Sequence, residues 1–109
     1  MPKPDLKVQK AASFLQCPFV AEEIAEALSS TCREVLDLRE APGTIIPYHS
    51  HPEDKTIVVL EGVLRLNVEE RLTVVEEGDV AIIRANAIHA YASIGKNPAR
   101  ILIGLSGSF

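Results

Sequence analysis

Short apolar stretches, separated by glycine, proline and charged residues, fill the chain from residue 34 onward. The clearest lies at 64–68, where Leu64, Leu66 and Val68 alternate with polar residues in the period-two pattern of a half-buried strand. The run 57–60 is apolar throughout. From these patterns we expect strands at 34–40, 45–51, 55–61, 64–68, 72–75, 80–83, 88–93 and 101–105.

Before the strands, one segment has helical rather than strand periodicity. Val20, Ile24 and Leu28 recur at intervals of four, which places them on one face of a helix. Pro18 suits a first helical turn, and the polar residues 29–31 end the segment. We therefore expect one short N-terminal helix ahead of an otherwise all-β chain.

Many short strands with close turns favour an antiparallel sandwich or barrel. The 109 residues suffice for one domain, and a content of 47% hydrophobic residues suits a globular core. We expect a single domain over residues 1–109.

The charge pattern excludes several classes of function. The formal net charge is −4 and no cluster of lysine and arginine stands out, so we expect no nucleic-acid partner. No apolar run is long enough to span a membrane, and the first ten residues lack the apolar core of a secretion signal. We expect a cytoplasmic protein. Its two cysteines, Cys17 and Cys32, should then be reduced and semi-buried.

The three histidines of the chain suggest a metal site. His49 and His51 are two residues apart, so on a strand both would face the same side as Ile45 and Pro47 and point into the barrel. His89 lies on another expected strand. Imidazole is the commonest ligand for transition metals, although two surface histidines near a strand end are the alternative.

The spacing around these histidines resembles the motifs of the cupin family. Residues 43–62 read glycine, five residues, His49, one residue, His51, three residues, Lys55, six residues and glycine. Residues 78–93 read glycine, five residues, Arg84, one residue, Asn86, two residues, His89, three residues and serine. In the family pattern these positions hold glutamate instead of Lys55, proline instead of Arg84, glycine instead of Asn86 and asparagine instead of the final Ser93.

The resemblance implies a single antiparallel jelly-roll β-barrel. It also implies that His49, His51 and His89 hold a divalent transition metal, which could be iron, zinc, manganese, nickel or copper. Cupins with such ligands include iron-dependent dioxygenases. Small cupins usually form homodimers, often through N-terminal strands and one sheet face, and residues 6–9 are the candidate strand here. The alternative is a barrel that has lost its metal and keeps the histidines as pocket lining.

Among the differences from the cupin pattern, Lys55 is the one at a metal-ligand position. Three interpretations of its role are open. It could turn to solvent and pair with Glu53 or Asp54. It could line the pocket, receive an anionic group of a ligand and act as a base. Alternatively, the loop could shift so that Glu53 or Asp54 reaches the metal.

Tyr91 is the second candidate catalytic residue. It lies two residues after His89 and should share its face, where its hydroxyl could donate a hydrogen bond to a ligand. The alternative is a tyrosine packed in the barrel.

Three functions follow as hypotheses. The first is a metal-dependent enzyme, dioxygenase-like or an isomerase, acting on a small polar molecule. The second is a non-catalytic module that binds a small molecule, with the metal structural or absent. The third is a degenerate cupin that acts only through its dimer surface.

Overall fold

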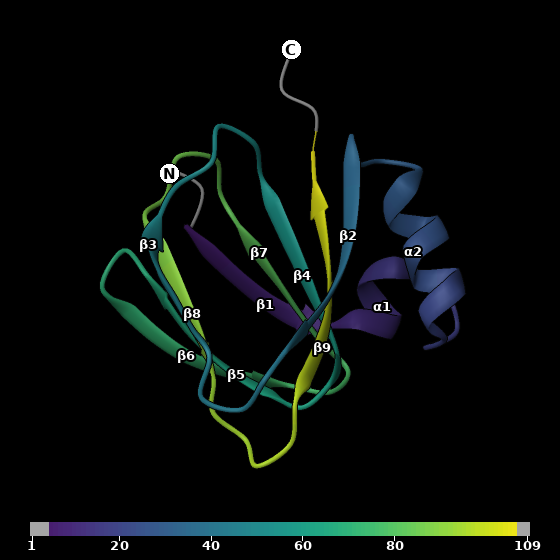
Figure 1. The fold of residues 1–109 in the computed structure, drawn as a ribbon. Coiled ribbons are helices and arrows are strands. Elements are labelled where there is room, and N and C mark those ends of the chain that lie inside the picture. The colour runs from purple at the N-terminus through teal and green to yellow at the C-terminus, as the bar shows by residue number, and fades with distance from the viewer. Residues whose placement is uncertain (1–4, 107–109) are drawn as a thin grey trace.

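Two antiparallel sheets pack face to face in residues 5–106, the part of the chain that this computed structural model describes (Figure 1). The predicted all-β jelly-roll architecture is confirmed. Sheet A has the order β1-β7-β4-β9-β2 and sheet B the order β3-β8-β5-β6. The strands of sheet A are β1 Leu6–Lys10, β2 Glu34–Glu40, β4 Lys55–Glu61, β7 Asp79–Ile83 and β9 Ala99–Leu105. Those of sheet B are β3 Ile45–His49, β5 Val63–Val68, β6 Arg71–Glu76 and β8 His89–Ser93.

Two short helices, α1 Ala11–Leu15 and α2 Ala21–Ser29, cover the outer face of sheet A (Figure 1). Helix α2 is the predicted one and buries Ile24 and Leu28. It begins at Ala21, later than Pro18 suggested, and its N-cap residue Val20 is 46% exposed. Helix α1 was not predicted, because five residues are too few to show a helical period.

Strand β4 is buried on both faces, which explains its continuous apolar run. Ile57 and Val59 belong to the core between the sheets, and Val58 and Leu60 pack with the helices. A strand buried on both sides has no need of polar residues at alternate positions. Burying each such side chain contributes about 1.5–3 kcal/mol to the stability of the fold. The apolar core on both faces therefore fixes the position of β4 in the sheet.

Strand β3 differs from the prediction in a way that matters for the histidines. It ends at His49, and its pairing with β8 shifts register between Ile46 and His49. Pro47 lies in this irregular stretch and has no N–H to donate to the ladder. The predicted shared face is therefore wrong, because Ile45 is 69% exposed on the outer surface while His49 is half-buried.

Two turns lie close to the histidines and adopt left-handed backbone. Asn86, at a glycine position of the cupin pattern, has φ +68°, a conformation that asparagine tolerates better than most residues. Its N–H donates to the carbonyl of His51 at 2.7 Å, so the turn before β8 is tied to the loop that carries His51. The hairpin between β5 and β6 turns at Glu69 and Glu70, with φ +45° and +69°.

Cys17 and Cys32 are free and half-buried, and both pack against the helical side of sheet A, in agreement with the prediction. Between residues 5 and 106, no helix combines the length and the apolar character needed to cross a membrane.

Candidate metal centre

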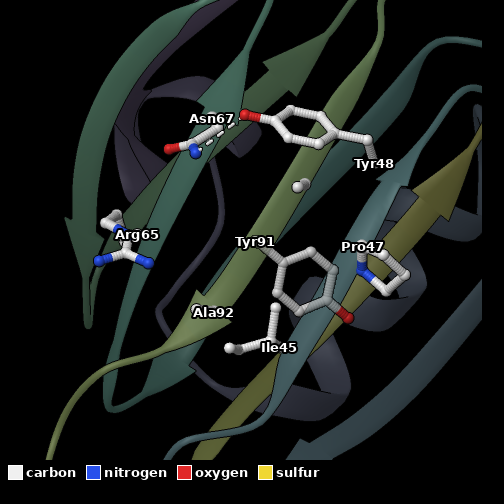
Figure 2. A pocket seen from close by; sticks show the side chains of 8 residues that line it. Ile45, Pro47, Tyr48, Arg65, Asn67, Tyr91 and Ala92 are labelled. Atoms are coloured by element: carbon white, nitrogen blue, oxygen red, sulfur yellow. Dashed lines mark hydrogen bonds between the residues drawn. The ribbon is translucent and has the colours of Figure 1, made fainter.

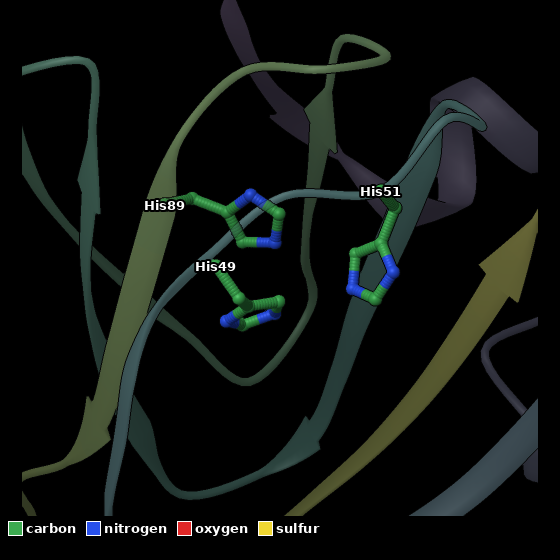
Figure 3. A group of neighbouring side chains, drawn as sticks. All are labelled: His49, His51 and His89. Atoms are coloured by element: carbon green, nitrogen blue, oxygen red, sulfur yellow. The ribbon is translucent and has the colours of Figure 1, made fainter.

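Three imidazoles converge at one end of the barrel, as the sequence predicted (Figure 3). His49 ends β3, His51 follows in the loop, and His89 opens β8 and pairs with His49 across the two strands. The ring centroid of His49 lies 4.3 Å from that of His89 and 4.8 Å from that of His51. One ligand nitrogen from each ring lies within 4.8 Å of the others, so the cluster could hold a metal ion.

Backbone carbonyls fix the tautomer of two of these rings. Nδ1 of His49 lies 2.7 Å from the carbonyl oxygen of Pro47, and Nδ1 of His89 lies 2.9 Å from that of Ala87. A carbonyl oxygen only accepts, so both Nδ1 atoms carry the proton and donate it. The Nε2 atoms are then left with free lone pairs. This is the second-shell arrangement that prepares histidines for metal binding.

Lys55 lies inside this cluster. It is 4% exposed, and its Nζ is 3.5 Å from Nε2 of His49 and 3.5 Å from Nε2 of His89. These contacts are at the long limit of hydrogen bonding. Of the three readings of Lys55, the orientation toward solvent is therefore not the one found.

The neighbouring carboxylates do not replace the missing glutamate. Glu53 forms an ion pair with Arg33, and Asp54 Oδ1 accepts a hydrogen bond from the N–H of Ala85 at 2.8 Å. Neither belongs to the cluster of potential ligands. The loop shift that would bring one of them to the metal is not found, and the donor set remains the three imidazoles.

Burial lowers the pKa of three groups at this site. It lowers the pKa of Lys55 to about 8, although the charge of Glu40 opposes this shift. Burial, helped by the charge of Lys55, lowers the pKa of His89 to about 4. The pKa of His51 is lowered by the same two causes. Near neutral pH, His89 and His51 are thus neutral and able to ligate, while most of Lys55 is protonated.

Tyr91 shares the inner face of β8 with His89, as predicted, but its hydroxyl is engaged. It donates to Oε2 of Glu40 at 3.0 Å, and its ring centroid lies 5.4 Å from Nζ of Lys55. Burial, together with the charge of Glu40, raises the pKa of Tyr91. Whether Tyr91 also meets a ligand stays a prediction, as does the catalytic role of Lys55.

Sequence reasoning missed Glu40. It ends β2, whose Leu38 packs on the core between the sheets. Residues two apart on a strand share a face, so Leu38 could have indicated that Glu40 points inward. Glu40 is half-buried, and its negative charge raises the pKa of both Tyr91 and Lys55.

The donor set fits a divalent transition metal. Zinc binds imidazole nitrogen at about 2.0–2.1 Å, which puts two ligand nitrogens of a tetrahedral site about 3.3 Å apart. Because the ligand atoms here span up to 4.8 Å, the rings must close slightly on an ion. Three imidazoles would leave coordination positions open for another molecule.

A shallow pocket of about 170 Å³ lies away from the histidines, on the outer face of sheet B (Figure 2). Ile45, Arg65 and Ala92 lie in one cross-strand row there, and Asn67 Nδ2 donates to the Tyr48 hydroxyl at 3.2 Å. None of the three histidines lines this pocket. The imidazole cluster, with its buried groups of lowered pKa, is therefore the stronger candidate for a functional site.

Comparison with known families identifies this architecture. A sequence profile described as Cupin domain matches residues 38–104, which is more than half of the chain and includes all three histidines. No curated protein sequence matches the chain.

Solved structures agree on the fold. The SPY1581 protein of unknown function from Streptococcus pyogenes is 20% identical over 69% of this chain and 64% of its own, with a TM-score of 0.63. The Cnp3 cupin domain of Schizosaccharomyces pombe is 15% identical over 68% of this chain and 55% of its own, with a TM-score of 0.66. A cupin described as RmlC-like from Shewanella frigidimarina is 18% identical over 69% and 68%, with a TM-score of 0.59. The matched region thus spans less than two thirds of the first two chains, and the likeness concerns the fold.

Proposed function

We propose that this chain, which belongs to the cupin family, binds one divalent transition metal ion through His49, His51 and His89 and uses it on a small polar molecule. One observation carries the proposal: Nδ1 of both His49 and His89 donates to a backbone carbonyl, which leaves Nε2 of each ring as the unprotonated nitrogen that an ion can use. Histidines that serve only as polar lining would not need this common orientation.

The chemistry would be oxidation, dioxygenase-like, or isomerisation. A bound ion of this kind supplies a Lewis acid that polarises an oxygen of the bound molecule. The chain would contribute the rest. The buried His89 and Lys55 keep one side of the site away from water, and the ammonium of Lys55 can attract a negatively charged group or, once deprotonated, accept a proton.

The second candidate is a binding module without catalysis, and the position of Lys55 favours it. An ammonium group 3.5 Å from two ligand nitrogens repels an incoming cation and contacts the lone pairs that the cation needs. A site weakened in this way could leave the barrel metal-free, holding a small anion on Lys55 and the imidazoles.

For both candidate functions we propose a cytoplasmic location.

Metal analysis tests the proposal. We expect protein purified without an affinity tag or added metal to carry close to one transition-metal ion per chain by elemental mass spectrometry. His49→Ala and His89→Ala should each lose the ion. The matched control is Ser50→Ala, which alters the exposed residue between two of the ligands and should keep full occupancy.

A folded wild type that takes up no metal, even after incubation with iron, zinc and manganese salts, would overturn the proposal. Full occupancy in His89→Ala would do the same for the assignment of the ligands. Circular dichroism of each variant separates loss of the ion from loss of the fold. If the ion is present, its identity selects the assay: oxygen consumption for iron, and isomerase assays for zinc or manganese.

A further inference from the structure

The side chain of Lys55 is buried in the proposed metal site. Lys55 opens β4, the central strand of sheet A, and pairs on one side with Ile83 and on the other with Leu105. Its side chain lies beside the Tyr91 ring and reaches two of the three imidazoles. A lysine in this place is a built part of the site rather than a surface residue folded over it.

The charges around Lys55 do not balance once a divalent ion is present. Imidazole binds a metal ion as the neutral ring, so the ion and the ammonium together bring three positive charges into a largely buried site. The half-buried carboxylate of Glu40 favours the charged form of Lys55, but it already accepts a hydrogen bond from Tyr91. Glu53 acts on His51 but is paired with Arg33. Buried charges of one sign are costly unless an opposite charge accompanies them.

We propose that the site takes its metal together with a small molecule bearing a carboxylate, one of whose oxygens faces the ion while the other accepts a hydrogen bond from Lys55. This inference rests on the proposed function and names the class of ligand. A carboxylate fits better than a single-atom anion, because its two oxygens can serve two cations at once. In this chain the carboxylate that the cupin pattern places at position 55 would come from the ligand.

Coupled binding is the measurable consequence. Each partner should raise the affinity of the other by the same factor, since coupling between two sites is reciprocal. Removing the charge of Lys55 should have two opposite effects. Metal alone should bind more tightly, because the repulsion is gone, and the carboxylate should no longer strengthen its binding.

Calorimetric titration of the metal-free full chain with Zn²⁺ tests this coupling. The titration is run at near-neutral pH with and without acetate, and the affinities are corrected for the formation of zinc acetate in solution. We expect acetate to tighten Zn²⁺ binding to the wild type roughly tenfold, within the usual range for coupled sites. Acetamide, which has the same shape without the charge, and chloride should have much smaller effects. In Lys55→Met the acetate effect should fall below about threefold.

Lys96→Met is the matched control, because it removes the same charge from the exposed turn before β9 and should behave like the wild type. Lys55→Gln repeats the test with a polar side chain, in case Lys55→Met alters the fold. Equal effects of acetate on the wild type and on both Lys55 variants would overturn the inference while leaving the metal site intact. Failure of the wild type to bind Zn²⁺ under any of these conditions would instead overturn the proposed function, and the inference with it.

Discussion

At the position where the cupin pattern has a glutamate, this chain buries an ammonium group against two imidazoles. The sequence left the burial of Lys55 open, because its position in the cupin pattern suggests the pocket whereas Glu53 and Asp54 before it suggest a charged surface loop. Its orientation depends on β4 lying in the centre of sheet A, which is a property of the whole fold. The histidines were easier to predict, since both of their motifs are contiguous in the sequence.

The buried charge of Lys55 should lower the free energy of unfolding of the metal-free protein. A buried ammonium is poorly solvated, and functional residues of this kind are often replaced with a gain of stability. We expect Lys55→Met to raise the free energy of unfolding of the metal-free protein by about 1 kcal/mol, measured by urea denaturation. Lys96→Met, at an exposed site, should change it by less than about 0.5 kcal/mol. A clear loss of stability in Lys55→Met would mean that the contacts of the ammonium outweigh its desolvation.

Tyr91 should matter for stability more than for metal binding. Its hydroxyl donates to Glu40 and is not among the potential ligands, so Tyr91→Phe leaves a carboxylate oxygen without this partner. We expect a loss of about 1 kcal/mol in the free energy of unfolding and a Zn²⁺ affinity that is almost unchanged. Tyr48→Phe is the control for stability, because the hydrogen bond that its hydroxyl accepts from Asn67 is exposed to solvent and should contribute less. A large fall in Zn²⁺ affinity in Tyr91→Phe alone would place its hydroxyl in the metal site after all.

At the scale of elements, the strand pattern predicted the sheets well and the irregular pieces poorly. The alternation of β5 and the apolar run of β4 both follow directly from burial on one or two faces. The bulge in β3 could not be read from alternation, because a register shift moves Ile45 to the outer face while the sequence pattern still suggests an inward one.

The β5–β6 hairpin contains left-handed residues that are not glycine. Glu69 also ties the hairpin to the metal centre, since its side chain and backbone both bind the backbone of Ile88, next to His89. Glu70 has φ +69°. We expect Glu70→Gly to raise the free energy of unfolding by about 0.5 to 1 kcal/mol, because the relief of left-handed strain exceeds the entropy that glycine loses on folding.

Glu77→Gly is the control for this turn effect. Glu77 also lies in a tight turn between strands but is not among the residues with positive φ, so the substitution should lower stability slightly. Thermal unfolding of both variants measures the difference. Equal effects of the two substitutions would show that the hairpin stores no such strain.

For the whole molecule, the two sheets differ in how their outer faces are covered. The helices cover sheet A, whereas the outer face of sheet B leaves Ile45, Leu72 and Val74 exposed by 69%, 64% and 56%. Residues 6–9, the strand expected to contribute to a dimer, lie in β1 and pair with β7 of the same chain. The homodimer stays a prediction, and sheet B is the face that best suits a second copy.

We expect light scattering to give twice the 11.8 kDa mass of one chain. Val74→Glu, on the edge strand β6 of this face, should shift the protein toward the monomer. Val20→Glu, on the helical side, places the same charge on another exposed valine and should not. A wild type that is monomeric at all concentrations would exclude the dimer.

The proposed function requires one metal ion among the three imidazoles. Anomalous diffraction at the zinc edge, from crystals of zinc-loaded protein, would locate this ion. We predict a single strong peak bound by Nε2 of His49, by Nε2 of His89 and by a ring nitrogen of His51, at about 2.0–2.1 Å. A barrel with no peak at this place, and with Nζ of Lys55 still against Nε2 of His49 and His89, would contradict the proposed function.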